Sequence, residues 1–417
     1  PGIASRSTTQ SSKNSALPSL LRPTVPEGGS LPIGLGRGGS KEGDSSFLSK
    51  PLNKNAVSRE DFEVLRVLGE GGFAQVKLVK YQGDGKLYAM KAVEKAVLID
   101  RRYAGDSHAE ERAQVERDIG VAAQEWKCPF IVMLFAAFQT DEKLYYILEY
   151  CEGGELFRHL KAQPHECFAE ETASFYAAEI CLALRHLHQN DTIHRDVRLE
   201  NVLLCNDGHI KLADFGIAKM QVSPTGQRPS HMFSFEDEEA MVHYPPEFYR
   251  GESYGKDLDC WQLGVATFVM LSGRLPSGQA TGVWPGELPG EASEAASDFC
   301  GALLQEEQLQ RLGHPEGAEQ LLTHSFFERI NWKALEQKDI TPPDRRSSQV
   351  TAQGSLPMER HPTQGWKVSN MLKLRGFSFT GPIFRGSNFL RISGKSASRA
   401  TTASSQSRGE SVYSPGA

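Results

Sequence analysis

Hydrophobic and polar positions alternate along the first part of the chain and then change to a helical period. Runs of strand length, alternating or continuously apolar, lie at residues 61–68, 75–79, 86–93, 130–139 and 144–151. Residues 107–125 are charged and helical in character, and apolar positions recur at helical spacing from 171 to 189. The pattern predicts an α+β fold: a small β-rich lobe with one main helix, a hinge near residues 149–154, and a larger helical lobe.

Charge is distributed unevenly along the chain. The whole sequence carries a net −6, and residues 1–57 and 344–417 carry +4 and +8, which leaves −18 on residues 58–343. An acidic centre disfavours direct nucleic-acid binding by that part and favours cationic partners such as basic peptides. The basic ends could contact an acidic membrane, nucleic acid or the core, but their composition favours solvated, disordered tails.

Cysteine usage and hydropathy bear on the compartment. Seven cysteines without a CxxC pair indicate free thiols in a reducing environment, so we expect an intracellular protein of the cytoplasm or nucleus. The longest apolar run, Trp261 to Leu271, is too short to span a membrane, and no signal peptide is evident. The first residue is Pro1 rather than Met, so we expect a fragment that an upstream targeting signal could precede.

Two short motifs carry the strongest chemical signal. They are HRDVRLEN at residues 194–201 and ADFG at 213–216. Asp196 is suited to accept or orient a hydroxyl proton, and the oxygens of Asn201 and Asp214 are suited to Mg²⁺. A single Asp is more often a cap or turn residue, but the ordered set predicts phosphoryl transfer from ATP with Mg²⁺.

A glycine-rich turn precedes these motifs, at residues 69–76 between two expected strands. Glycines let backbone amides approach phosphate, although such a turn is weak evidence alone, and the following strand excludes a dinucleotide fingerprint. Lys91 has apolar neighbours on both sides, so we expect it to point into a cleft and pair with phosphate and a helix carboxylate. Glu116 is the chosen partner, with Glu110 and Glu111 as the other candidates. The expected nucleotide contacts of the turn are Gly69, Glu70, Gly71, Gly72, Phe73, Ala74 and Val76.

Further motifs follow in the order found in eukaryotic protein kinases. They are YPPE at 244–247, DLDCWQLGV at 257–265, QRLG at 310–313, HSFFERINW at 324–332 and LRGFSF at 374–379. With the two earlier motifs they resemble the AGC group, relatives of protein kinases A, G and C, over residues 61–379. The tail is most similar to that of the ribosomal-protein kinases in this group. The resemblance implies that Arg311 pairs with Glu247.

The resemblance implies a bilobal protein kinase fold and transfer of the ATP γ-phosphate to Ser or Thr of protein substrates in a basic context. The alternatives are a catalytically weak nucleotide-binding scaffold and a basic-tailed adaptor. The implied catalytic residues are Asp196, Lys91, Arg198 and Asn201, and the implied metal ligands are Asn201 and Asp214. The implied contacts around the adenine and ribose are the gatekeeper Leu148, the Glu149 carbonyl, the Cys151 amide, Glu155, Glu200, and the flanking Val76, Ala89 and Leu203. Glu155 would reach the ribose or a basic substrate side chain.

The same resemblance divides the chain into four parts, and we expect a monomer. These parts are a disordered segment at 1–57, a kinase domain at 58–328 with lobes at 58–150 and 151–328, an AGC-type tail at 329–382, and a disordered basic tail at 383–417.

Several positions depart from the family pattern. Arg198 stands where serine/threonine kinases usually carry Lys, and a planar guanidinium is not a compact ammonium. Ala240, in the run EEAMVHY, replaces the usual Thr of the segment that seats the substrate. Val269 stands where kinases of basic substrates often place an acid. Gly120 replaces a large apolar residue one turn after Glu116, so either the helix end is irregular or Glu116 is the wrong partner.

Two regulatory hypotheses follow from the family comparison. The acidic run at residues 236–239 occupies the region of the family's activating phosphothreonine, and it would pair with Arg195 unless the run is only a solvated loop. Phosphorylation of Ser378 by an upstream kinase would dock Phe377 and Phe379 on the small lobe and order the helix that bears Glu116. The alternative is a flexible tail whose aromatic residues bind elsewhere.

Overall fold

The computed structural model describes the central part of the chain. The described residues are 57–71, 74–103, 108–222, 241–276, 287–343, 374 and 376–381. All of them belong to one compact unit that spans residues 52–417. The expected disordered ends, the acidic run at 236–239, and Gly72, Phe73 and Ala240 lie outside the described residues.

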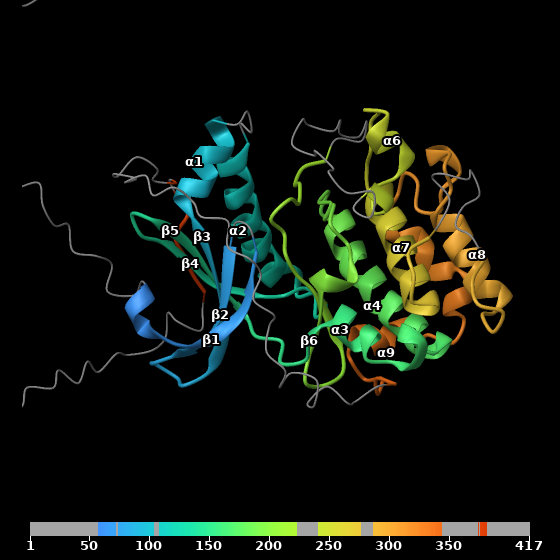
Figure 1. The fold of residues 1–417 in the computed structure, drawn as a ribbon, viewed down its shortest axis with the longest axis horizontal. Coiled ribbons are helices and arrows are strands. Elements are labelled where there is room, and N and C mark those ends of the chain that lie inside the picture. The colour runs from blue at the N-terminus through green and yellow to red at the C-terminus, as the bar shows by residue number, and fades with distance from the viewer. Residues whose placement is uncertain are drawn as a thin grey trace, which may run out of the picture. The chain divides into compact units, whose positions relative to one another are not determined.

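The first lobe is an antiparallel sheet of six strands in the order β1-β2-β3-β5-β4-β9 (Figure 1). The strands are β1 (Phe62–Glu70), β2 (Ala74–Tyr81), β3 (Leu87–Glu94), β4 (Leu134–Gln139), β5 (Lys143–Glu149) and β9 (Phe379–Thr380). Two helices, α1 (Lys95–Tyr103) and α2 (Ala109–Trp126), connect β3 to β4 and pack on this lobe. The five long strands and α2 confirm the predicted elements, whereas α1 is a second helix that the sequence pattern did not reveal.

The second lobe is helical and has a small three-stranded sheet at the entrance. Its regular elements are β6 (Gly154–Glu155), α3 (Leu156–Lys161), α4 (Glu170–Gln189), β7 (Val202–Leu204), β8 (Ile210–Leu212), α6 (Pro246–Tyr249), α7 (Asp257–Ser272), α8 (Glu294–Leu303) and α9 (Trp332–Glu336). The short 3₁₀ helices are η1 (Arg59–Asp61), η2 (Pro164–Glu166), η3 (Leu199–Asn201), η4 (Gln308–Gln310), η5 (Ala318–Thr323) and η6 (Ser325–Phe327). The α+β fold class predicted from the sequence is confirmed.

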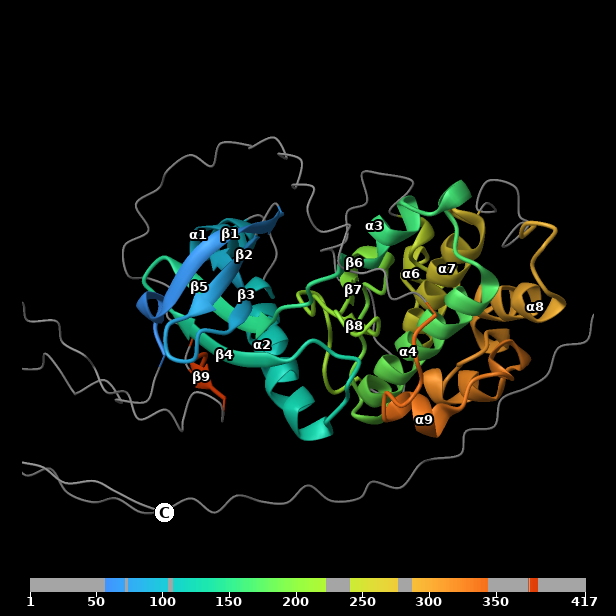
Figure 2. The same ribbon diagram turned by 90° about the horizontal axis from the view of Figure 1, so that it is seen from below.

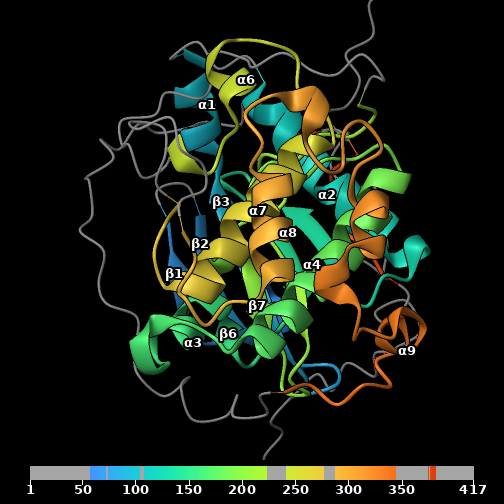
Figure 3. The same cartoon turned by 90° about the vertical axis from the view of Figure 1, so that its right-hand side faces the viewer.

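Helix α7 forms the centre of the second lobe, against α4 and α8 (Figure 3). Its residues from Asp257 to Leu271 are all buried, the apolar ones on every side of the helix and a few polar ones among them. Gly264 allows α8 to approach closely, because a Cβ there would lie 2.8 Å from the Cβ of Leu303. The helix therefore gives the lobe a rigid core on which polar side chains can be fixed.

Arg311 ties three segments of this lobe together, as its resemblance implied. Its guanidinium donates to both carboxylate oxygens of Glu247, at 2.6 and 2.9 Å, and lies 3.4 Å from Asp257. All three side chains are at most 2% exposed. Because each charge is fully paired, the YPPE segment is held against the start of α7 despite the cost of burying ions.

Gly120 lies where α2 crosses β4. A Cβ on this residue would come within 2.7 Å of the Cβ of Leu134, closer than two carbon atoms can pack. Helix α2 is continuous through this position, and the side chain of Gln124, one turn later, donates to the carbonyl of Leu134. The glycine is thus compensated by a closer approach of the helix to the sheet, and the helix end is regular.

Replacing Gly120 by Leu should force α2 away from Leu134. We expect a loss of roughly 1–3 kcal/mol in the free energy of unfolding, measured by urea denaturation, because the core there has no room for the side chain. Gly301→Leu in α8 is the matched control, since a Cβ at Gly301 meets nothing within 4 Å. An equal effect of the two substitutions would show that close packing at Gly120 is unimportant.

Candidate active site

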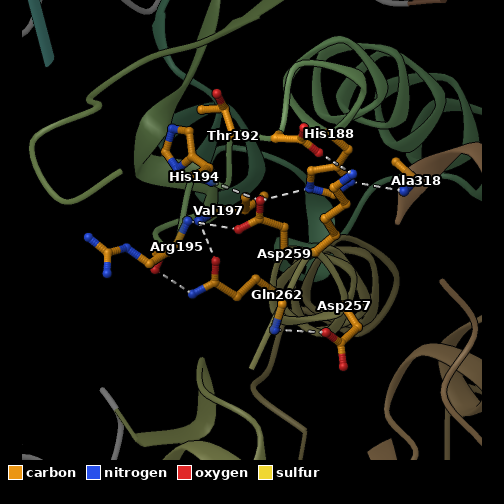
Figure 4. Close-up of polar contacts among 12 residues, drawn as sticks. His188, Thr192, His194, Arg195, Val197, Asp257, Asp259, Gln262 and Ala318 are labelled. Carbon is orange, nitrogen blue, oxygen red and sulfur yellow. Dashed lines mark hydrogen bonds and ion pairs between the residues drawn. The ribbon is translucent and has the colours of Figure 1, made fainter. Parts of the chain in front are cut away.

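The loop that carries Asp196 is fixed by a buried carboxylate on α7 (Figure 4). Asp259 is 0% exposed and accepts hydrogen bonds from the backbone N–H groups of His194 and Arg195, at 2.8 and 2.7 Å. Gln262, one turn later on the same face, accepts from the N–H of Val197 and donates to the carbonyl of Arg195. Four backbone groups of the loop are therefore held by two side chains of one helix.

His188 completes this anchor. Its Nδ1 accepts from the N–H of Ala318 at 3.0 Å, so Nε2 carries the proton and donates to Asp259 at 2.9 Å. Burial by itself would raise the pKa of Asp259, but the hydrogen bonds from His188 and the loop outweigh it and lower the pKa. The carboxylate stays charged, as an acceptor of three hydrogen bonds must. In the sequence Asp259 stands out only as part of the motif DLDCWQLGV, and no sequence signal marks the roles of Gln262 and His188.

Asp196, Asn201 and Asp214 lie together at the open end of this loop. The amide of Asn201 donates to the carboxylate of Asp196 at 2.8 Å and to its backbone carbonyl at 2.9 Å. His194 accepts from the N–H of Asp196 through Nδ1, so its Nε2 donates to the carbonyl of Ala213 at 3.1 Å. The histidine thus links the segment of Asp196 to the segment of Asp214.

Two non-glycine residues of the site have a left-handed backbone. The φ angles are 68° at Arg195 and 62° at Asp214, and such conformations are rare for residues with a Cβ. They persist only where the surroundings impose them, as the contacts of Asp259 and His194 do here. Arg195 donates to the hydroxyl of Tyr254 and to the carbonyls of Ile217 and Ala218. Its expected pairing with residues 236–239 lies outside the described residues.

Lys91 on β3 connects the two lobes. Its ammonium lies 2.6 Å from Glu116 on α2 and 2.8 Å from Asp214 in the second lobe. Burial by itself would lower the pKa of Lys91, but the charges of Asp214 and Glu116 outweigh it and raise the pKa above its usual value. Glu116 was therefore the right choice among the acids of the helix, and its regular position agrees with the close packing at Gly120.

These charges surround one cavity of about 270 Å³. Burial raises the pKa of Asp196 and of Glu116, whereas the charge of Lys91 holds the pKa of Asp214 below its usual value. The cavity is lined by Gly71, Ala74, Lys91, Val93, Leu98, Ala109, Arg112, Ala113, Glu116, Tyr146, Asp196, Asp214, Gly216 and Ile217. A glycine-rich turn, a lysine and three carboxylates around one cavity are suited to hold phosphate groups and a divalent cation.

Residues 62–327 match the family described as "Protein kinase domain". The chain belongs to the protein kinase domain family. It is 36% identical to Protein kinase 3 of Dictyostelium discoideum, over 71% of this chain and 33% of that protein. It is 35% identical to serine/threonine-protein kinase Sgk1 of Danio rerio, over 70% and 66% of the two chains. It is 36% identical to human RAC-beta serine/threonine-protein kinase, over 71% and 60%.

The kinase chain spans from about one third to just under two thirds of the length of these relatives. The resemblance to the AGC group is confirmed by the Sgk1 and RAC-beta relatives. The finer likeness of the tail to ribosomal-protein kinases stays a prediction. Protein kinase domains in general use ATP and Mg²⁺.

The residues of this kinase that the sequence assigned to the purine lie around the hinge between the lobes. Leu148 on β5 pairs with Ala89 on β3, and Leu148 and Leu203 both pack against a small buried cluster that contains Cys151. Val76 pairs with Gly69 across the glycine-rich turn and with Lys91 on its other side. The contact of adenine with these residues stays a prediction.

The polar members of the expected nucleotide set are engaged elsewhere. The carboxylate of Glu70 accepts from the side chain of Gln75 at 3.2 Å. The side chain of Glu149 forms an ion pair with Lys211 at 3.0 Å. Only its backbone carbonyl was expected to contact adenine, and the ion pair does not involve that group. Glu155 and Glu200 form ion pairs with Arg158 and Arg198. Gly72 and Phe73 lie outside the described residues.

The donor set is compatible with a magnesium nucleotide. Asp214 offers carboxylate oxygens, and Asn201 keeps its amide oxygen available because its NH₂ group is the part that bonds Asp196. Among the described residues no cluster of three or more His, Cys, Asp or Glu side chains could hold a metal by itself. Proteins usually bind Mg²⁺ through one or two side chains together with the substrate's phosphates.

Asp259→Asn should loosen the catalytic loop, because the amide replaces a charged acceptor of three hydrogen bonds and points a donor at other donors. We expect the free energy of unfolding to fall by roughly 3 kcal/mol, with faster hydrogen exchange at residues 194–197. Asp298→Asn is the control, since this exposed carboxylate has only one ion pair, with His324. Unchanged exchange in the loop would contradict the anchoring role of Asp259.

Proposed function

We propose that this chain is an ATP-dependent serine/threonine protein kinase. The observation that carries the proposal is the placement of Lys91, Glu116, Asp196 and Asp214 around one cavity. Lys91 lies 2.6 Å from Glu116 and 2.8 Å from Asp214, and Asn201 bonds the carboxylate of Asp196 at 2.8 Å. The serine/threonine kinases among its relatives support the same activity. The catalytically weak scaffold finds no support among these relatives, and it rests only on the altered segment at 238–244.

Each polar group has a definite role in this proposal. Asp196 accepts or orients the proton of the attacking hydroxyl, and its raised pKa makes it a stronger base than an ordinary aspartate. Asn201 fixes the orientation of that carboxylate through one hydrogen bond to it and a second to the backbone carbonyl of Asp196. Lys91 neutralises phosphate charge, and Glu116 holds the lysine in place.

Bound Mg²⁺–ATP supplies the transferable phosphoryl group and neutralises charge on it. Asn201 and Asp214 would hold the metal with their side-chain oxygens. In the structure Asp214 is paired with Lys91, so the lysine and the metal would share this carboxylate or divide its two oxygens between them. The backbone amides of the glycine-rich turn would approach the phosphates from the other side.

The C-terminal tail supports a regulatory role for Ser378 (Figure 2). Phe377 is completely buried, its ring lies 5.4 Å from that of Tyr146 at an edge-to-face angle, and β9 pairs with β4. Arg117, the neighbour of Glu116, donates to the carbonyl of Gly376 at 2.5 Å. Ser378 is exposed. The tail thus contacts the helix that positions Lys91, and an upstream kinase has access to the serine.

The proposal includes a cellular setting. All seven cysteines are among the described residues and are free thiols, which agrees with a reducing cytoplasm or nucleus. No helix in the described part of the chain has the length and apolar character of a membrane span. The predicted monomer stays part of the proposal.

Asp196→Asn should abolish phosphate transfer to a Ser/Thr peptide library while nucleotide binding persists, because the base is lost and the phosphate-binding groups remain. Labelled ATP with magnesium measures transfer, and ATP-induced thermal stabilisation measures binding. We expect a loss of at least about 100-fold in the rate of transfer. Stabilisation by ATP without transfer in the unsubstituted chain would instead favour the scaffold.

Phe377→Ala should undock the tail, because it removes a completely buried ring, and should increase hydrogen exchange in α2 while lowering kcat. The loss in docking free energy should be about 3–5 kcal/mol. Phe379→Ala is the control, since this ring is only partly buried, and its effect should be smaller. If Ser378→Ala leaves both activity and protection of the tail unchanged, phosphorylation of that serine does not regulate the kinase.

A further inference from the structure

Glu155 and Glu200, two carboxylates that a basic substrate could approach, already have a cationic partner within this chain. The guanidinium of Arg198 donates through Nε to one oxygen of Glu200 at 2.9 Å and through a terminal nitrogen to the other at 2.8 Å. Arg158, one turn into α3, donates through Nε to Glu155 at 3.1 Å. Two negative charges beside the catalytic loop are thereby neutralised.

The pair of Arg198 and Glu200 is local and firmly set. They are two positions apart in sequence, and each side chain is about one-third exposed, at 36% and 35%. Both oxygens of the Glu200 carboxylate are therefore occupied by one guanidinium.

Among the described residues, the groups around this pair add no negative charge that could replace Glu200. Val269, at the position where kinases of basic substrates often carry an acid, is buried and apolar. His243 feels the charges of both Arg198 and Glu200, and burial followed by the charge of Arg198 lowers its pKa to about 4. The histidine is thus uncharged at neutral pH. Asp196 also faces Arg198, but the proposed reaction requires it at the acceptor hydroxyl.

A substrate arginine could reach Glu200 only by displacing Arg198. The exchange would replace one two-pronged guanidinium–carboxylate contact by another of the same kind and leave Arg198 without its partner. A lysine at position 198, which the family normally has, is a point charge and cannot occupy both oxygens in this planar geometry. The departure at Arg198 therefore changes what Glu200 can bind, and its effect is not confined to the phosphate.

We propose that Arg198 is a specificity-determining residue that occupies Glu200, so that this kinase selects serines and threonines in uncharged rather than basic surroundings. The proposal rests on the proposed kinase function and differs from the basic preference predicted from the sequence. Glu155, with its single and more exposed contact to Arg158, retains a weak attraction for cations. Arg198 acts here by blocking a carboxylate and needs no contact with substrate.

The test measures peptide binding, which does not require phosphate transfer. Two fluorescent peptides, each with Ala in place of the acceptor Ser, carry either Arg or Gln at the flanking positions. Their dissociation constants are measured by anisotropy with a non-hydrolysable ATP analogue and magnesium. We expect the unsubstituted chain to bind the two within about twofold of each other. Arg198→Lys should raise the preference for the Arg peptide about tenfold, because it frees one oxygen of Glu200.

The controls separate this role from a general loss of structure. Arg198→Lys combined with Glu200→Gln should return the ratio to that of the unsubstituted chain, and Arg198→Gln should raise it as Arg198→Lys does. Arg158→Lys, the matched change at the weaker pair, should alter it by less than about threefold. Because the ratio compares two peptides on one protein, partial unfolding cancels.

Two results overturn the proposal. One is a tenfold or greater preference of the unsubstituted chain for the Arg peptide that Glu200→Gln removes, since Glu200 would then be open to substrate. The other is an unchanged ratio in both Arg198 variants. If the ratios behave as expected but the parent Ser peptides receive no phosphate from ATP, the kinase function fails while the role of Arg198 stands.

Discussion

The catalytic geometry of this protein depends on one buried carboxylate. Asp259 accepts two backbone N–H groups of the catalytic loop and the ring N–H of His188, with no exposure to water. A buried charge is tolerated there only because three donors hydrogen-bond it. Any other conformation of the loop would leave these donors without an equally good acceptor. The left-handed backbone of Arg195 follows from this constraint.

A second constraint joins the lobes. Lys91 belongs to the sheet, Glu116 to α2 and Asp214 to the helical lobe. Both carboxylates lie within 2.8 Å of the lysine ammonium, so charges from three separate segments meet at one point. The pKa of Lys91 rises although burial opposes its charge, which shows that the two carboxylates outweigh the loss of water. The tail reaches the same centre through Arg117, which gives a route from Phe377 to the phosphate-binding lysine.

Departures from the family pattern are matched by local changes. Gly120 removes a side chain from α2, and the helix approaches Leu134 to fill the space. Arg198 introduces a planar cation, and Glu200 takes up both of its nearest donors. In each case the effect of the unusual residue depends on the residue that it contacts. Neither change disturbs the hydrogen bond between Asn201 and Asp196.

The sequence by itself determined the fold class, the main strands and helices, and the chemistry of Asp196, Asn201, Asp214 and Lys91, because motif order and hydrophobic period are local properties. It missed α1, which is a short helix of nine residues. It also missed Gln262 and His188, whose partners lie about 65 to 71 residues away along the chain. The sequence selected Glu116 from the neighbouring acids, and the tertiary structure confirmed that choice and revealed the pairing of Glu200 with Arg198. Which charged groups meet depends on how the chain folds and packs. A carboxylate that looks free in the sequence is neutralised when the guanidinium of a nearby arginine bonds both of its oxygens.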